Sequence, residues 1–425
     1  MTASAATLWI HLSLLNELQR RVEAALQHLG ADAANGARRE MKLFSSLSYA
    51  MVYLYGPTPQ GTQACLTALK LARKIGDYSN QERALLALWN GCFANGEVRR
   101  SLEIAEQFME VATNLGPADT FVAHRLLGSS HFYLGNAITA RQHMEIMVAG
   151  YGATSHDAHM ARFGFNQLAS ARGLLALHLC FLGYFNQAMQ SVRQAAAEAI
   201  DSNHVMTTCA VFCTSCIPIA IYTGYLEEAR RYVSMLFEQA GGRGLKRWEN
   251  FALGFDGVLH LREGKLKQGL ENLSTCVAQA DDRANTRYMM IFTEHALALG
   301  HAGNAQAGLV AIDEVLGRLA GTGERWYFPE LYRCRAELLY LCGHSPLEVE
   351  TVLQEALSLA DEMSALTWRL RTAKAYAVFL QGQGRVEEGV AVLKASYDAF
   401  IEGHEAPELA STRELLLGLG THPGM

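Results

Sequence analysis

A glycine that recurs about every 40 residues is the feature that most constrains the fold of this chain. It is followed by a small, polar or aromatic residue, and then usually by an aliphatic residue and an alanine or glycine. The repeated glycines are Gly96, Gly135, Gly183, Gly224, Gly264, Gly303, Gly343 and Gly384. Their spacings are 39, 48, 41, 40, 39, 40 and 41 residues, and one further period before Gly96 leads to Gly56. A fixed period over most of a chain indicates a repeat architecture.

Each period is typical of two antiparallel helices with the glycine between them. Glycine takes the left-handed conformation that ends many helices without a steric penalty. The chain has only eight prolines and long runs rich in Ala, Leu, Glu and Gln, which favours helices on both sides of each glycine. Because one helix pair cannot cover its own apolar faces, neighbouring pairs must stack. The sequence therefore predicts an all-α fold: a tetratricopeptide-like α-solenoid, a right-handed superhelix of about nine to ten antiparallel helix pairs.

The same spacing predicts how the array is organised. The one long interval, between Gly135 and Gly183, indicates an insertion, which we place in the loop from Gly150 to His156. No proline-rich or serine-rich linker divides the chain, so we expect residues 1–425 to form one continuous array. A final helix at about 407–417 is expected to cap it. The repeat turns are expected near residues 56, 96, 135, 183, 224, 264, 303, 343 and 384.

Composition argues against several functional classes. Half of the residues are hydrophobic and 18% are charged, which supports a packed interior. The net charge is -6 and no basic stripe is present, so we expect no direct nucleic-acid partner. Nine scattered cysteines, with no secretory leader in Met1–Leu14, indicate a cytoplasmic protein. The uncharged stretch Val205–Leu226 is long enough to cross a bilayer, but it lies in register with the repeats, so we expect a buried helix and no membrane partner.

Motifs that resemble catalytic or metal sites fit structural roles better. Cys209, Cys213 and Cys216 have the spacing of ligands to an iron–sulfur cluster, but they fall on one face of a predicted helix. The segment His156–His159 supplies two imidazoles and a carboxylate, but it lacks the third ligand and the glutamate base of a zinc hydrolase. A solvated loop is expected there, with a weak metal site as the alternative. Since the sequence has no phosphate-binding loop or nucleophile elbow, we expect no enzymatic activity and no cofactor.

Two groups of aromatic and charged residues are candidate binding positions. Trp326 precedes a helix that carries Glu330 and Arg333, while Trp368 and Arg371 lie early in the first helix of the next pair. First helices line the concave face of such arrays, so these five side chains are predicted to contact a ligand or partner in a groove. The alternative is that the tryptophans lock adjacent pairs and that the charges form helix-surface pairs worth a few tenths of a kcal/mol.

Several segments together resemble one family. They are Trp326–Leu339 (WYFPELYRCRAELL), Trp368–Arg371, Tyr397–Leu409, Leu12–Glu17 and Arg125–Gly128. Taken in their order along the chain, they resemble the C-terminal tetratricopeptide-repeat half of large bacterial transcriptional regulators, which also carry a winged-helix DNA-binding domain and a signal-transduction ATPase domain. Neither of those domains is encoded here, so the DNA and ATP binding of the family are not carried over. The resemblance implies that the helical half receives an inducer or partner and releases the nucleotide domain from inhibition.

Two functions are consistent with the sequence. One is a non-catalytic sensor module of a bacterial regulatory protein, which binds a small-molecule inducer on the concave face and signals to a DNA-binding or ATPase part. The uncharged stretch at 205–226, beside aromatic and charged helix starts, favours this function. The alternative is a protein-interaction scaffold that binds a peptide or partner protein in the groove, which the length of the array and its mildly acidic character favour.

Overall fold

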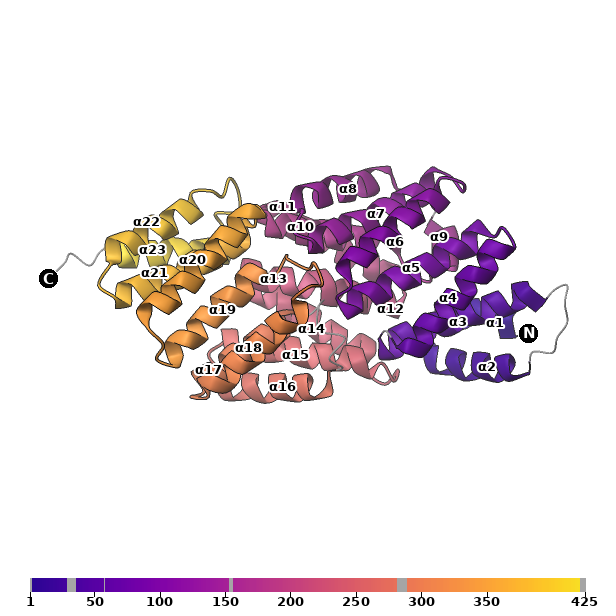
Figure 1. The fold of residues 1–425 in the computed structure, drawn as a ribbon, viewed down its shortest axis with the longest axis horizontal. Helices are drawn as coiled ribbons and strands as arrows, with labels where there is room; N and C mark the ends of the chain where they lie inside the picture. Colours follow the sequence, from indigo (N-terminus) through magenta and orange to yellow (C-terminus); the bar gives the residue numbers. More distant parts are fainter. Residues whose placement is uncertain (1, 29–35, 57, 153–155, 281–288, 421–425) are drawn as a thin grey trace.

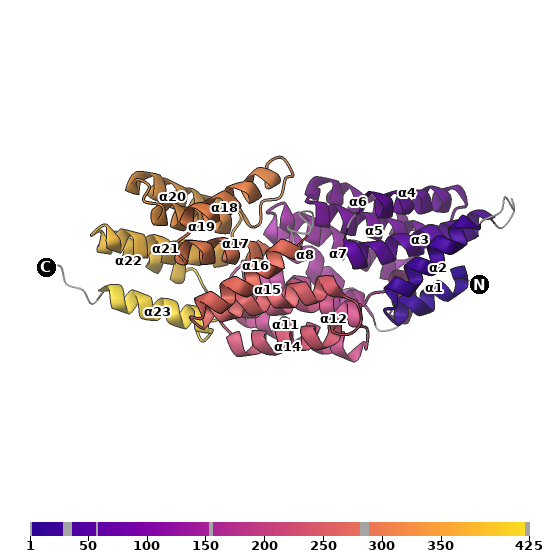
Figure 2. The same ribbon diagram turned by 90° about the horizontal axis from the view of Figure 1, so that it is seen from below.

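A computed structural model describes residues 2–28, 36–56, 58–152, 156–280 and 289–420. All regular secondary structure in these ranges is helical, and antiparallel helix pairs follow one another along the molecule, with the two termini at opposite ends of its long axis (Figures 1 and 2). The pairs are α1 (Thr2–His11) with α2 (Leu15–Gln27), α3 (Gly36–Tyr55) with α4 (Pro59–Lys74), α5 (Tyr78–Asn95) with α6 (Val98–Ala112), α7 (Pro117–Tyr133) with α8 (Ala137–Gly150), α10 (Gln167–Phe181) with α11 (Phe185–Asp201), α12–η2–α13 (Val205–Val211, Phe212–Cys216 and Ile217–Thr223) with α14 (Leu226–Ala240), α15 (Lys246–Arg262) with α16 (Leu266–Gln279), α17 (Met289–His301) with α18 (Ala305–Leu319), α19 (Phe328–Leu341) with α20 (Pro346–Glu362), and α21 (Leu366–Gly382) with α22 (Val386–Tyr397). The predicted all-α, tetratricopeptide-like solenoid is confirmed.

The glycines lie where the two helices of each pair meet. All nine predicted turn glycines have a positive φ, between 73° for Gly96 and 90° for Gly135. Residues with a side chain seldom adopt this conformation, so glycine at these turns lets the second helix start immediately. The turn of the first pair is made differently, by Ser13 with a φ of 55°, and the glycine period therefore missed it.

The insertion between Gly135 and Gly183 is where the prediction was wrong. It contains a short helix, α9 (His156–Phe163), in addition to a loop whose residues 153–155 lie outside the described ranges. His159 and Phe163 lie one turn apart on this helix and are 2% and 3% exposed, so the helix buries a face that the solvated-loop prediction did not anticipate. In the described part of the chain no group of metal-binding side chains is placed to hold a metal ion.

The long uncharged stretch forms the continuous helix α12–η2–α13. By length and hydropathy, residues Val205–Thr223 qualify as one candidate membrane span among the described residues, but 78% of that window is buried within the protein. Cys209, Cys213 and Cys216 are fully buried along this helix, and burial raises the pKa of all three thiols. The helix therefore occupies the buried position that its register with the repeats predicted.

The superhelix turns tightly enough for distant pairs to touch, and we call these contacts the inter-turn contacts. The backbone N–H of Arg325, just before α19, donates to the carbonyl oxygen of Tyr133 at the end of α7, at 2.8 Å. Farther along the chain, Thr367 of α21 donates to the carbonyl oxygen of Cys180 at the end of α10. The capping helix α23 (Pro407–Gly420) lies against the turn at Gly224, close to the predicted 407–417. Each inter-turn contact thus joins the end of one first helix to the start of another five pairs later.

Candidate ligand-binding site

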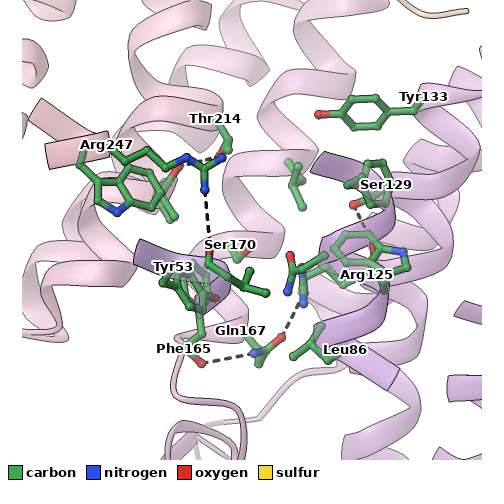
Figure 3. A pocket seen from close by; sticks show the side chains of 18 residues that line it. Tyr53, Leu86, Arg125, Ser129, Tyr133, Phe165, Gln167, Ser170, Thr214 and Arg247 are labelled. Atoms are coloured by element: carbon green, nitrogen blue, oxygen red, sulfur yellow. Dashed lines mark hydrogen bonds between the residues drawn. The ribbon is translucent and has the colours of Figure 1, made fainter. Parts of the chain in front are cut away.

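A cavity lies inside the N-terminal half of the superhelix, where the first helices of successive pairs face one another (Figure 3). Its volume is about 90 Å³. At about 10–15 Å³ for each water molecule, this is room for roughly six to nine waters. The lining residues are Val52, Tyr53, Leu86, Trp89, Asn90, Phe93, Arg125, Ser129, Tyr133, Phe165, Gln167, Ser170, Leu174, Ala210, Val211, Thr214, Arg247 and Trp248.

Aromatic rings form much of the cavity wall and hold one another in place. The Trp89 and Phe93 ring centroids are 4.3 Å apart, and those of Phe93 and Tyr133 are 4.7 Å apart, both with edge-to-face geometry. The Trp89 Nε1–H donates to the hydroxyl of Ser130 at 3.0 Å, so its orientation is fixed as well. Because these rings pack against each other, the apolar wall is formed before any ligand arrives.

Two arginines reach the cavity from opposite sides, Arg125 from α7 and Arg247 from α15 (Figure 3). Arg125 is only 5% exposed, and its Nε donates to the side-chain oxygen of Gln167 at 3.0 Å. Its guanidinium carbon lies 5.5 Å from the Trp89 ring centroid. Arg247 is half-buried and its Nη1 donates to the carbonyl oxygen of Val52 at 3.4 Å. No aspartate or glutamate is among the described residues that line the cavity.

The wall beside Arg247 contains the one irregular stretch of the long central helix. The π-helical turn η2 ends just before Pro218, which has no N–H to donate to the carbonyl of Thr214. Thr214 lines the cavity, and its hydroxyl donates to the carbonyl oxygen of Ala210 at 2.8 Å. Helix α10 approaches η2 so closely at Gly173 that a Cβ there would lie 2.8 Å from the Ser215 hydroxyl. The π turn is therefore fixed between the cavity and α10.

Trp248 brings a further polar group to this wall. The residue lines the cavity and is 4% exposed. Its Nε1–H is buried and has no hydrogen-bond acceptor among the described residues. A buried donor without a partner is destabilising by about 1–3 kcal/mol.

A second, open site lies in the C-terminal half and is a groove of about 880 Å³. It runs mainly along α15, α17, α19, α21 and α23, and it exposes apolar side chains such as Tyr340 and Val378, each 52% exposed. Its charged lining residues are paired with one another or with neighbours. For example, Lys374 Nζ lies 2.9 Å from a Glu408 oxygen, and His301 Nε2 lies 2.8 Å from Glu337.

Three of the predicted site residues form an ion-pair network at the wall of this groove. Glu330 is 1% exposed and accepts hydrogen bonds from Arg333 and Arg371, each with a shortest distance of 2.8 Å. Burial on its own raises the pKa of Glu330, but the charges of the two arginines and their hydrogen bonds outweigh it and lower the pKa to about 2. Arg333 and Arg371 line the groove, whereas Glu330 lies behind them. Ligand contact by these three residues stays a prediction.

The two predicted tryptophans lie elsewhere. Trp326 and Trp368 are 5% and 2% exposed, and neither lines the groove or the cavity. The Trp368 Nε1–H donates to the carbonyl oxygen of Trp326 at 2.8 Å, while the Trp326 ring packs on Phe132 and Tyr133 of α7. They therefore lie at the inter-turn contacts, which is the locking arrangement considered as the alternative. The two tryptophans contact each other across adjacent pairs, and Trp326 also contacts α7, which is far away in the sequence.

Sequence reasoning missed the cavity itself. Arg125 was part of a segment that resembles a family, but neither it nor Arg247 or Trp248 was predicted to bind a ligand. The sequence did contain a signal for the cavity: cationic or polar residues on the apolar face of first helices. Comparing the apolar face of each first helix with that of its neighbours would have found them.

No family model matches the chain, and no curated protein matches it. Solved structures that resemble it include a tetratricopeptide repeat protein from Parabacteroides merdae, at 12% identity and a TM-score of 0.37, covering 71% of this chain and 99% of that chain. A Rap protein complexed with competence and sporulation factor has 10% identity and a TM-score of 0.43, covering 99% and 96%. The human IFIT1 dimer with m7Gppp-AAAA has 12% identity and a TM-score of 0.46, covering 96% and 87%. At these identities the likeness concerns the helical-repeat fold alone.

Proposed function

We propose that this chain is a non-catalytic, cytoplasmic sensor module of a bacterial regulatory protein, and that its N-terminal cavity binds a small-molecule inducer. The observation that carries the proposal is which helices contribute residues to the cavity wall. Lining residues come from the first helices of six consecutive pairs: α3, α5, α7, α10, α12–η2–α13 and α15. A molecule bound there touches one whole turn of the superhelix, so its binding energy acts on the curvature of the array.

The inter-turn contacts connect a change in curvature at the cavity to the C-terminal pairs. The Tyr133 side chain lines the cavity, and its backbone carbonyl accepts the N–H of Arg325. Its ring also packs against Trp326, with centroids 5.3 Å apart. A shift of α7 around a ligand therefore acts directly on the start of α19. The resemblance to regulator halves suggests that the signal then passes to a DNA-binding or ATPase part.

Thermal unfolding against a metabolite panel, with a small-molecule extract of the native lysate included, tests the proposal. A ligand at a hundred times its dissociation constant adds about 2.7 kcal/mol to the stability of the form that binds it. We expect one compound to raise the melting temperature. If neither the panel nor the extract raises it, the sensor function is wrong.

A second candidate function is a scaffold that binds a peptide or partner protein in the C-terminal groove. The observation in its favour is the exposed apolar surface around Tyr340 and Val378. Such side chains in a concave surface are typical of a groove that takes an amphipathic segment. Affinity capture of a specific partner from native lysate, lost when Val378 is replaced by aspartate, would favour this function over the sensor.

A further inference from the structure

We infer that helix α9, together with Phe165 directly after it, is a proton-sensitive lid over the N-terminal cavity. This inference rests on the proposed function, because it describes how a ligand reaches the same cavity. The cavity of about 90 Å³ has room for a few water molecules, whereas pockets for small-molecule ligands usually span about 300–1,000 Å³. An inducer therefore needs a wider form of the cavity than the one in this structure.

The connection between α9 and α10 brings a side chain from outside the repeat pairs into the cavity wall. Phe165 lies beside Tyr53 and is the one described lining residue that no paired helix contributes (Figure 3). Gly164, between α9 and Phe165, has a positive φ of 62°. The next residue, Asn166, is held in place, because its backbone N–H donates to the Thr207 hydroxyl at 3.1 Å. A motion of α9 about this point would withdraw Phe165 and leave the start of α10 in place.

Helix α9 is short and is not part of a helix pair. It has eight residues and lies against α1, α5 and α10. A helix of this length is not stable alone in water, so contacts with the rest of the protein must hold it. The Phe163 ring centroid lies 6.2 Å from that of Phe108, and the Tyr49 hydroxyl donates to the carbonyl oxygen of Gly164 at 2.7 Å. A segment held by few contacts opens more readily than the paired helices around it.

A buried network of ionisable side chains fixes α9 to α5 and α7. Arg162 of α9 pairs with Glu82 of α5 at 2.7 Å and also with Asp119 of α7. The Nε2 of His159, on the same helix, lies 2.9 Å from the Asp119 oxygen, and its Nδ1 lies 2.8 Å from the Tyr151 hydroxyl. Glu82 and Asp119 are both buried. Arg162 therefore lies between two buried carboxyl groups.

These two carboxyl groups hold their protons differently. Burial and the charge of Asp119 raise the pKa of Glu82 to about 8, although the charge of Arg162 opposes the shift. Burial alone would raise the pKa of Asp119 too, but its hydrogen bond to His159 and the charge of Arg162 lower it. The network therefore holds one carboxylate beside Arg162 until Glu82 ionises. Ionisation then adds a second buried carboxylate, and opening the lid exposes it to water.

The other ionisable groups on the surrounding elements lie at the edges of this network. Arg83 of α5 faces Tyr49 of α3, and Arg125 of α7 faces Tyr151, which follows α8. Burial raises the pKa of both tyrosines, so both stay neutral through the pH range of the test. Helix α1 carries His11 as its one ionisable side chain. Protonation of Glu82 therefore favours the closed lid, and its ionisation favours the open one.

Hydrogen exchange of the full chain between pH 5.5 and 7.5, corrected for intrinsic exchange rates, tests the lid. The closed form holds the Glu82 proton up to about pH 8, whereas the open form releases it near the ordinary pKa of 4.5. We expect α9 amides to be at least about tenfold less protected than those of α8 and α10, and their protection to fall about tenfold for each pH unit. Equal protection in all three helices would overturn the lid, because α9 would then open only when the whole protein unfolds.

Matched variants assign the proton. Glu82→Gln keeps the shape of the side chain and removes its ionisation, so α9 protection should become nearly independent of pH. Glu145→Gln is the control, because Glu145 pairs with Arg141 on the surface of α8, and it should keep the slope of the unaltered chain. An unchanged slope in Glu82→Gln would overturn the proton link. The measurement on the unaltered chain needs no variant, so it holds even where a substitution prevents folding.

A thiol in the cavity wall tests whether the opening admits a small molecule. Ala210→Cys places one in the lining, and tandem mass spectrometry follows its labelling by methyl methanethiosulfonate. Adding Arg162→Gln breaks the pairing that holds α9, so the introduced thiol should react at least about tenfold faster at the same pH. The neighbouring Cys209 is fully buried and should react no faster. An unchanged rate at the introduced thiol, or an equal rise at Cys209, would overturn the lid.

The lid and the function on which it rests fail in different experiments. If α9 is as protected as α8 and α10 while one compound still raises the melting temperature, the lid is wrong and the cavity remains a ligand site. If α9 opens as expected and admits the thiol reagent, but neither the metabolite panel nor the native extract raises the melting temperature, the lid stands and the proposed function is wrong.

Discussion

The cavity of the N-terminal pairs and the groove of the C-terminal pairs are both lined mainly by first helices, and both contain arginines with different surroundings. In the groove, Arg333 and Arg371 share the carboxylate of Glu330. In the cavity, Arg125 and Arg247 lie among aromatic rings, amides and hydroxyls. The same repeat geometry therefore yields one surface built around arginine–glutamate ion pairs and another whose described lining contains no carboxylate.

This difference teaches how a repeat array acquires a ligand site. The geometry of a helix pair determines which residues point inward. It does not determine which side chains of the next pair they contact. Where a glutamate stands one pair along, as Glu330 does for Arg371, the arginine stabilises the stack. Where the neighbouring pairs offer rings and amides, as Trp89 and Gln167 do for Arg125, the arginine becomes part of a cavity wall.

The largest effect is expected from breaking the charge balance of the groove. Glu330→Ala leaves the buried Arg333 and the half-buried Arg371 without their shared carboxylate, and losing one partner of a buried ion pair is destabilising by about 3–5 kcal/mol. Urea unfolding at pH 7 measures the change. Glu388→Ala is the control, because Glu388 pairs with Arg385 on the exposed surface. A loss in Glu330→Ala no greater than that of the control would show that the groove network adds no stability.

The next prediction concerns the pH dependence of stability, which has opposite signs for a carboxyl in each half. Burial and the nearby charge of Asp119 raise the pKa of Glu82, on α5, to about 8, although Arg162 opposes the shift. The folded state therefore keeps the Glu82 carboxyl protonated at pH values where the unfolded chain ionises it. The resulting contribution to stability is complete below about pH 4.5 and is lost as pH rises through 8. Glu330 has the opposite sign, because its lowered pKa contributes stability that is present above about pH 4.5 and is lost as pH falls towards 2.

Glu82→Gln should therefore flatten the fall in stability between pH 5.5 and 7.5, by about 1.4 kcal/mol for each pH unit. Denaturant midpoints of the variant and of the unaltered chain at several pH values give the slopes. Glu324, whose pKa burial also raises to about 8, is present in both proteins, so the difference isolates Glu82. Parallel pH curves would contradict the assignment.

A smaller effect is expected at the inter-turn contacts that join the halves. Trp368→Phe removes the N–H that the Trp326 carbonyl accepts and keeps most of the ring packing. Leaving that buried carbonyl without a donor is destabilising by about 1–3 kcal/mol. Hydrogen exchange should show faster opening at both the end of α7 and the start of α19, since Trp326 packs on Tyr133. Faster exchange in α19 alone would mean that the contact does not couple the halves.

The sequence predicted the parts of the fold that depend on local geometry. The helical pairs and the buried helix at 205–223 follow from residues close to one another in the chain. The prediction failed at Ser13, where a residue other than glycine makes the turn, and at α9, where the inserted segment buries His159.

The site was less predictable because it depends on curvature. Arg125 and Arg247 lie in different pairs and reach the same cavity only through the summed rotations of the intervening helices. Trp326 and Trp368 were singled out because aromatic residues beside charges are typical of binding sites. The same residues also suit a buried contact between superhelical turns, and a single sequence does not distinguish the two.

The central claim is that the cavity, and not the groove, takes the small-molecule ligand. Its most direct test is the ligand-induced rise in melting temperature in two matched variants, Ala210→Leu in the cavity and Ala375→Leu in the groove. Each adds three carbon atoms to the lining of its own site. The account predicts that Ala210→Leu abolishes the rise while Ala375→Leu keeps it. Loss of the rise in Ala375→Leu, with Ala210→Leu unaffected, would contradict the account and assign binding to the groove.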